Sequence, residues 1–346
     1  MTQTFTYFRW PFLITIIGLI LSYWLGYQTT GTVAGALSFL LIGGILSVLE
    51  ISLSFDNAIV NANILKGMEP KWQHRFLTWG ILIAVFGMRI VFPLAVVAIA
   101  AKIGPISAIV LAASDPQEYA RIMDDAHVGI SAFGGTFLMM VALSYFMDQS
   151  KEVDWIGPIE RRLRSLASIR GLEIAAVLFT ALILSAVLPR DESATFLFAA
   201  VCGLVTFLAV ELLAHFLDAQ KEAQTMAARG GLGAFLYLEV LDASFSFDGV
   251  IGAFALTQNL FLIAIGLGIG AFYVRSTTIM LVERQTLSEF RYLEHGAFYS
   301  VLALAMVMYA QSLVLIPEII TGLIGAALIS LSLFSSIRLN KAEQKA

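Results

Sequence analysis

Four carboxylates stand within two similar apolar segments of the chain. Residues 49–60 read LEISLSFDNAIV and residues 241–252 read LDASFSFDGVIG, with six of twelve positions identical. The carboxylates are Glu50 and Asp56 in the first segment and Asp242 and Asp248 in the second. An ionisable side chain inside such an apolar stretch is costly unless it has a partner, so these four are candidate functional residues.

The first segment also carries a polar stripe at helical spacing. Positions i, i+4, i+7 and i+11 of one helix face hold Glu50, Ser54, Asn57 and Asn61. The matching face of the second segment holds Asp242, Ser246, Gly249 and Ala253, so the first half is richer in ligands. Because serines compete for backbone hydrogen bonds, we expect local helix breaks that turn carboxylates and freed carbonyls toward one centre.

Carboxylate, amide and backbone carbonyl oxygens are hard ligands, which suit Mn²⁺, Ca²⁺ or Mg²⁺ better than Zn²⁺ or Cu⁺. The four carboxylates and the two arginines in the apolar stretches that follow have a net charge of −2, which one divalent cation neutralises. The expected central metal ligands are Asp56 and Asp248, and Glu50, Asp242 and Asn57 would complete or gate the site. The expected counter-charges or gating residues are Arg89, Arg275, Ser54, Ser246 and Asn61.

The same order of features follows each acidic segment. A buried arginine comes next and then a helix opened by a histidine, as Arg89 and His127 in the first unit and Arg275 and His295 in the second. The histidines could be ligands or proton relays, or ordinary residues at a helix entry. Three other ionisable residues near the ends of apolar stretches have no assigned role: Glu211, His215 and Glu239.

Composition requires a membrane around these segments. The chain has 346 residues, of which 59% are hydrophobic and only 13% charged, and its mean hydropathy is +0.85. A soluble protein usually carries about 25% charged residues, so a cytosolic enzyme and a secreted domain are excluded. The net charge of −4 offers no basic domain for nucleic acid, and the single Cys202 excludes an internal disulfide and a thiolate cluster.

We expect an all-α polytopic membrane protein with about ten transmembrane helices, because that many apolar runs can cross the hydrocarbon core. The runs are 11–29, 36–64, 76–101, 128–147, 172–189, 194–217, 234–257, 260–282, 296–314 and 317–337. The two acidic segments lie in the second and seventh runs, an odd separation, so the three-helix units would be inverted relative to one another. Inverted repeats are typical of secondary transporters, whose substrate site lies near the midplane.

The basic residues give the orientation. Sixteen of the 21 Lys and Arg residues fall on the side of the N-terminus, so both termini should be cytoplasmic and the loop 102–127 should lie outside. The expected organisation is an N-terminal helix (1–35), a first repeat (36–150), a basic cytoplasmic loop with a linking helix (151–193), a second repeat (194–314) and a C-terminal helix and tail (315–346).

The motifs SVLEISLSFDNAIVNANIL and LEVLDASFSFDGVIGAF resemble the paired acidic signatures of the TerC family of integral membrane proteins, in the lysine-exporter superfamily. The resemblance covers roughly residues 36–314. It implies a bacterial inner-membrane protein linked to manganese efflux, with the family's acidic residues at Glu50, Asp56, Asp242 and Asp248. The sequence departs from an Asp-Asn pair in the second half, where Gly249 follows Asp248.

We therefore expect a divalent cation exporter rather than an enzyme, with Mn²⁺ as transported substrate (Ca²⁺ or Mg²⁺ as alternatives), no organic cofactor and no nucleic-acid partner. It would work by alternating access in the lipid bilayer, and exchange of the metal for protons on its carboxylates could couple the two gradients. Three alternatives stay open. They are an exporter of a cationic amino acid, an intramembrane aspartyl protease and a non-transporting membrane scaffold. The oligomeric state is not predicted.

Overall fold

The computed structural model describes residues 2–80, 83, 87, 91, 94, 98, 102–149, 151, 153–169, 171–222, 231–257, 259–284, 290–314, 316 and 318–343. Within these ranges the side chains of 2–5, 52, 53, 56, 116, 120, 123, 213–222, 243–252, 254, 255, 318, 319, 321, 322 and 343 are not described. All regular secondary structure in the described residues is helical.

The helices follow the apolar runs of the sequence. The first half contains α1 (Thr2–Thr30), α2 (Val33–Leu53), α3 (Phe55–Lys66), α4 (Pro70–Arg75), the π-helix η1 (Phe76–Gly80), α6 (Pro105–Ser114), α7 (Pro116–Asp125) and α8 (His127–Phe146). The second half contains α9 (Gly157–Leu166), α10 (Leu172–Val187), α11 (Arg190–Glu222), α12 (Leu232–Leu256), α13 (Leu260–Glu283), α15 (Leu293–Gln311) and α16 (Glu318–Glu343).

Seven described helices are long and apolar enough to cross a membrane, as expected of a polytopic membrane protein. They include Thr6–Thr30, Val33–Ile51, His127–Phe146, Arg190–Leu212, Leu260–Glu283, Leu293–Gln311 and Leu323–Ala342. The count of ten stays a prediction. Helix α10 has 16 residues, the run 76–101 lies mostly outside the described residues, and the side chains of 243–252, 254 and 255 in α12 are not described.

Burial separates inner helices from outer ones. The most apolar windows of α8, α13 and α15 are 61% buried, whereas those of α1 and α16 are only 17% buried. Bulky apolar side chains such as Ile20 and Trp24 on α1 and Phe334 on α16 are exposed. In water this surface would drive aggregation, but it is the surface that a helix presents to lipid.

Small residues let the inner helices approach one another closely. A Cβ added at Gly266 of α13 would lie 2.5 Å from the Leu46 Cβ of α2, and one added at Gly270 would overlap the side chain of Glu50. In a bilayer, helix association depends on such close packing because lipid tails are as apolar as the helices. The α2–α13 contact therefore holds the first acidic segment against the second half of the chain.

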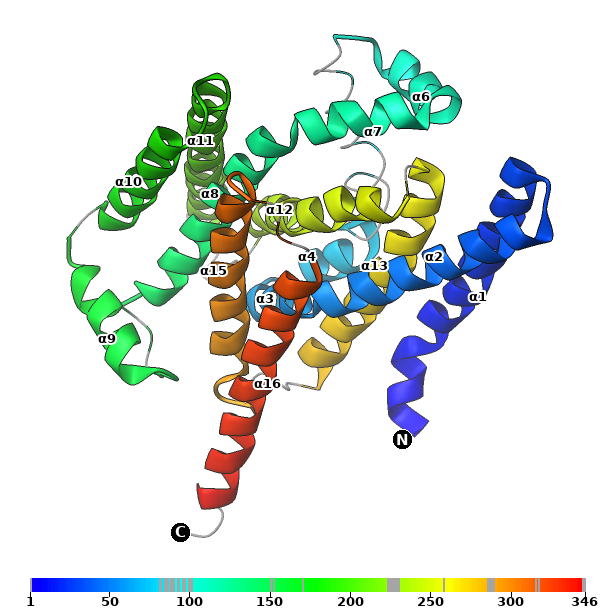
Figure 1. Ribbon diagram of the computed structural model, residues 1–346. Coiled ribbons are helices and arrows are strands. Elements are labelled where there is room, and N and C mark those ends of the chain that lie inside the picture. The colour runs from blue at the N-terminus through cyan, green and yellow to red at the C-terminus, as the bar shows by residue number, and fades with distance from the viewer. Residues whose placement is uncertain are drawn as a thin grey trace.

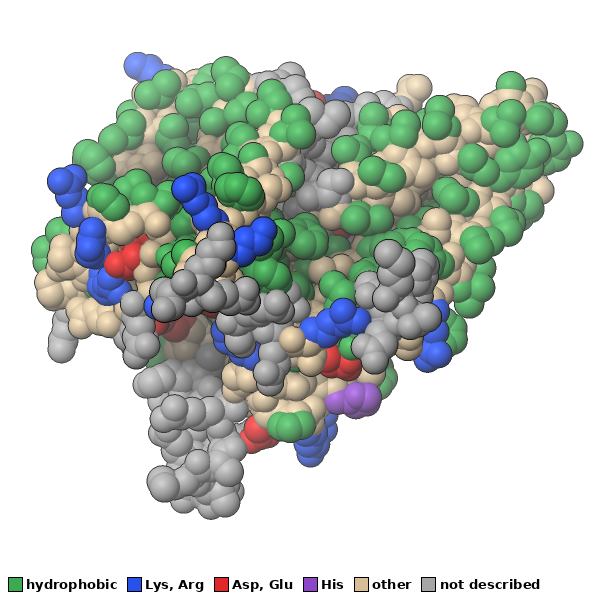
Figure 2. All heavy atoms as spheres, turned by 90° about the horizontal axis from the view of Figure 1, so that it is seen from below, with side chains coloured by type: hydrophobic (Ala, Val, Ile, Leu, Met, Phe, Trp, Pro, Cys, Tyr) green, Lys and Arg blue, Asp and Glu red, His purple; other side chains and the backbone are tan. Residues whose placement is uncertain are grey.

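Both termini lie at the lower end of the ribbon in Figure 1, and α6 and α7 lie at the upper end. Figure 2 looks at the molecule from below and shows Lys and Arg side chains spread over this face. Exposed basic residues of the described part include Lys66, Lys71, Arg161, Arg162 and Arg338. Which end faces the cytoplasm stays a prediction.

Candidate functional site

The first acidic segment is broken at Ser54. Helix α2 ends at Leu53 and α3 begins at Phe55, with Ser54 at φ −97° and ψ 15° between them. The Ser54 hydroxyl donates to Glu50 Oε1 at 3.0 Å, and its backbone N–H donates to the Glu50 carbonyl at 3.0 Å. The expected break is thus present in the first segment. Helix α12 is continuous through the second segment, so there the expectation of a break is wrong.

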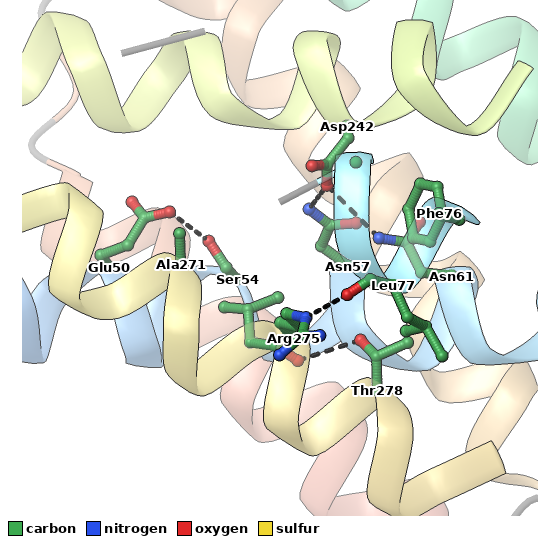
Figure 3. Close-up of a pocket in the computed structure, with 12 residues that line it drawn as sticks. Glu50, Ser54, Asn57, Asn61, Phe76, Leu77, Asp242, Ala271, Arg275 and Thr278 are labelled. Carbon is green, nitrogen blue, oxygen red and sulfur yellow. Dashed lines mark hydrogen bonds between the residues drawn. The ribbon is translucent and has the colours of Figure 1, made fainter. Parts of the chain in front are cut away.

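Beside this break lies a pocket of about 450 Å³, a volume that includes its opening to the outside (Figure 3). Five helices contribute to its wall: α2, α3, η1, α12 and α13. The polar residues that line it are Glu50, Ser54, Asn57, Asn61, Asp242, Arg275 and Thr278. The structure therefore brings predicted site residues from both acidic segments to one cavity.

Asp242 is held by two amides of α3. Asn57 Nδ2 donates to Asp242 Oδ1 at 2.5 Å, and Asn61 Nδ2 lies 3.3 Å from the same oxygen. Both asparagines are nearly fully buried, with exposed fractions of 4% and 3%. The two donors stabilise the carboxylate without adding charge.

Arg275 lines the same pocket from α13. Its Nε donates to the backbone carbonyl of Leu77 in η1 at 2.5 Å. One turn further along α13, the hydroxyl of Thr278 donates to the Ala58 carbonyl of α3 at 3.4 Å. The guanidinium therefore places a positive charge in the cavity that contains Glu50 and Asp242, and its role as a counter-charge stays a prediction.

Several predicted residues fall outside what the structure describes. Asp56 lies on α3, and Ser246 and Asp248 lie on α12, but their side chains are not among those described. Arg89 lies outside the described residues altogether. Among the described residues no group of three or more His, Cys, Asp or Glu side chains is placed to hold a metal ion. The metal-ligand role of all five predicted residues stays a prediction.

The two histidines do not line the pocket. His127 begins α8 and its Nε2 lies 3.4 Å from the hydroxyl of Ser131. His295, near the start of α15, has Nε2 2.9 Å from the Val153 carbonyl and is only 4% exposed. A direct relay to the pocket from either ring is therefore not visible in this conformation. Glu211 is exposed on α11 and the side chain of His215 is not described.

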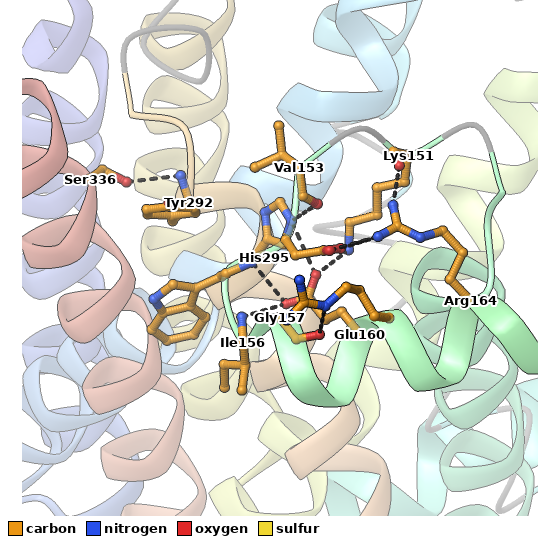
Figure 4. Close-up of polar contacts among 12 residues, drawn as sticks. Lys151, Val153, Ile156, Gly157, Glu160, Arg164, Tyr292, His295 and Ser336 are labelled. Carbon is orange, nitrogen blue, oxygen red and sulfur yellow. Dashed lines mark hydrogen bonds and ion pairs between the residues drawn. The ribbon is translucent and has the colours of Figure 1, made fainter. Parts of the chain in front are cut away.

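A second polar cluster, which the sequence did not predict, surrounds Glu160 of α9 (Figure 4). Its carboxylate is 1% exposed, accepts from Lys151 Nζ at 2.9 Å and lies 3.4 Å from His295 Nε2. It also accepts from the backbone N–H groups of Trp155 and Ile156, at 3.2 and 3.0 Å. Spacing could not reveal this cluster, because His295 follows Glu160 by 135 positions and the basic loop reads as solvated.

Burial shifts the pKa values of Glu160 and Lys151 in opposite directions. Burial alone would raise the pKa of Glu160, but the Ile156 N–H and the Lys151 ammonium bring it below its ordinary value. Burial lowers the pKa of Lys151, although Glu160 opposes the shift. Lys151 also lies over the ring of Tyr145, 4.1 Å from its centroid. The cluster docks the 151–166 segment onto the ends of α8 and α15.

The fold and the pocket define a multi-pass helical membrane protein with a polar cavity between its helices. The chain belongs to the DUF475 family, whose description is "Protein of unknown function" and whose sequence model matches residues 55–343. No curated protein and no solved structure matches the chain.

Proposed function

We propose that the protein exports a divalent metal cation, with Mn²⁺ as the first candidate, by alternating access around the Glu50–Asp242 pocket. The ion class follows from the donor chemistry, because carboxylate and amide oxygens prefer hard divalent cations. The direction of transport and the choice of Mn²⁺ follow from the resemblance of both acidic segments to the TerC family. The proposed location in the bacterial inner membrane rests on the same resemblance.

One observation supports this proposal above the others. Oxygen-bearing side chains from the two acidic segments, 185 residues apart at Asn57 and Asp242, meet inside an otherwise apolar helical bundle. A scaffold protein would have no need for such a cavity, since carboxylates within a membrane are costly unless they are paired inside the protein or serve a substrate. A midplane site between two halves is the arrangement found in secondary transporters.

The asparagines suggest how the pocket changes when it takes up a cation. Each amide carries N–H donors and a carbonyl acceptor on one plane, so a half-turn of the side chain exchanges them. With N–H toward Asp242 the carboxylate is satisfied. With oxygen turned inward, Asn57 would add a neutral ligand to those of Glu50 and Asp242. Arg275 would then balance the charge when the cation leaves.

Proton coupling is part of the same proposal. When a divalent cation leaves two carboxylates, the pocket gains negative charge in a low-dielectric environment, and protons can replace it. Exchange of one cation for protons from the other side would let the proton gradient drive export. Dissipating that gradient should then slow export even when the cation gradient is unchanged.

The test is Mn²⁺ uptake into inside-out membrane vesicles, which corresponds to export from the cell. Glu50→Gln and Asp242→Asn should each reduce the initial rate at least tenfold, because each removes a charged ligand and keeps its volume. Asp56→Asn and Asp248→Asn test the ligands whose side chains are not described. The matched control is Glu118→Gln, which removes an exposed carboxylate of α7 that does not line the pocket.

Three results would overturn the proposal. One is Mn²⁺ uptake in all four variants at the rate of the parent protein. Another is uptake of a cationic amino acid that excess lysine inhibits and Mn²⁺ does not, which would indicate an exporter of a cationic amino acid. Cleavage of a single-span substrate by the purified protein would instead indicate a protease.

A further inference from the structure

Two buried oxygens near Asp242 have no hydrogen-bond partner within the described part of the chain. They are Oδ1 of Asn61 and Oε1 of Glu239. Asn61 is 3% exposed and already uses its amide nitrogen toward Asp242. Buried polar atoms are almost always paired, so two unpaired acceptors in one region need an explanation.

Glu239 lies just behind the wall of the pocket. It precedes Asp242 by three residues on α12, so the two carboxylates share a helix face. A Cβ added at Gly80 of η1 would lie 2.8 Å from Glu239 Oε1, and Gly80 itself lines the pocket. The missing side chain at Gly80 is thus what leaves room beside the carboxylate oxygen.

Asn61 lines the pocket from α3. It follows Asn57 by one helical turn on α3, toward the basic end of that helix at Lys66. Glu239 is likewise displaced from Asp242 toward the N-terminal end of α12, next to the loop that the basic-residue bias assigns to the cytoplasm. Both unpaired oxygens are therefore displaced from the Asn57–Asp242 contact toward the same expected side of the membrane.

We infer that Glu239 and Asn61 form a second oxygen site for the divalent cation, one helical turn from Asp242, where the ion is loaded before it reaches Glu50 and Asp242. This inference rests on the proposed function, because it assigns a loading position to the same cation. A carboxylate and an amide oxygen, both unpaired, are ligands of the hard class. Their displacement of about 5 Å along the helices is one helical turn.

The experiment measures initial rates of Mn²⁺ uptake into inside-out vesicles across a range of Mn²⁺ concentrations. Glu239→Gln should raise KM by about tenfold or more and change kcat less, because loading is impaired while the Glu50–Asp242 pocket is intact. Gly80→Ala should raise KM in the same direction, since its methyl group would crowd Oε1. Glu239→Asp should recover part of the affinity.

A purely structural carboxylate would give a different result. Glu239→Gln would then lower the thermal stability in detergent and leave KM unchanged, and this outcome overturns the inference while the proposed function stands. If Glu239→Gln does not accumulate in the membrane, Gly80→Ala and Glu239→Asp are measured in its place. The inference is overturned if both variants have the KM of the parent protein. If the parent protein itself transports no Mn²⁺, the proposed function fails, and the loading site fails with it.

Discussion

Replacing Glu160 by glutamine tests whether the buried cluster on α9 holds the 151–166 segment in place. The substitution keeps the volume and an oxygen that can accept from the Trp155 and Ile156 N–H groups, but it removes the charge. Lys151, whose side chain is 10% exposed, then loses the counter-charge that lies 2.9 Å from its ammonium. Leaving one partner of a buried ion pair uncompensated costs about 3–5 kcal/mol of unfolding free energy.

Part of this loss is offset by the aromatic rings beside Lys151. The ammonium lies 4.1 Å from the Tyr145 ring centroid and 4.9 Å from that of Phe146. Such contacts stabilise a cation by about 0.5–2 kcal/mol. We therefore expect Glu160→Gln to lower the unfolding free energy by about 2–4 kcal/mol. Adding Lys151→Met should restore much of this loss, because the double variant no longer buries an unpaired charge.

The assay is unfolding of the purified protein in mixed micelles, followed by tryptophan fluorescence because Trp155 belongs to the cluster. The control is Glu118→Gln in the exposed pair with Arg121, whose side chains are 40% and 61% exposed. An exposed pair contributes at most about 1 kcal/mol. The reasoning is refuted if Glu160→Gln destabilises the protein no more than Glu118→Gln does.

The stability difference between the parent protein and Glu160→Gln should also depend on pH. The pKa of Glu160 is lower in the folded protein than its ordinary value. Its contribution to stability is therefore complete above the ordinary pKa and is lost as the pH falls through the lower, folded-state pKa. The stability difference between the parent and Glu160→Gln should be constant near neutral pH and should shrink below about pH 4. A difference that grows with acidity would contradict this.

Two further predictions concern packing and topology. Gly270→Ala should destabilise the protein by about 1–3 kcal/mol and reduce transport, because the added Cβ would overlap Glu50. Gly44→Ala, which would meet only a side chain at 3.9 Å, should do neither, and equal effects in thermal unfolding would contradict the packing argument. In a background without the native cysteine, an impermeant thiol reagent added to intact cells should label Gln117→Cys on α7 and not Ser165→Cys on α9. The reverse pattern would invert the predicted topology.

Much of the helical plan followed from local sequence. Long apolar runs with few charges predict membrane helices wherever they occur, and the long described helices lie on those runs. The short helices α6, α7 and α9 formed in stretches that were predicted to be loops. The break at Ser54 was also predicted, because a serine competes with the helix for hydrogen bonds within a few residues of itself. The polar stripe of α3 was predicted for the same local reason, since helical periodicity alone puts Asn57 and Asn61 on one face.

The partners of these residues were decided by tertiary structure. No local rule predicts that Asn57 and Asn61 donate to Asp242, which is 185 and 181 residues away. His295 was expected as a possible relay because a histidine opens the third helix of each repeat, but it faces Glu160 and Val153 instead. Such contacts depend on how helices pack, and packing is fixed by shape and burial over the whole bundle and not by spacing along one segment.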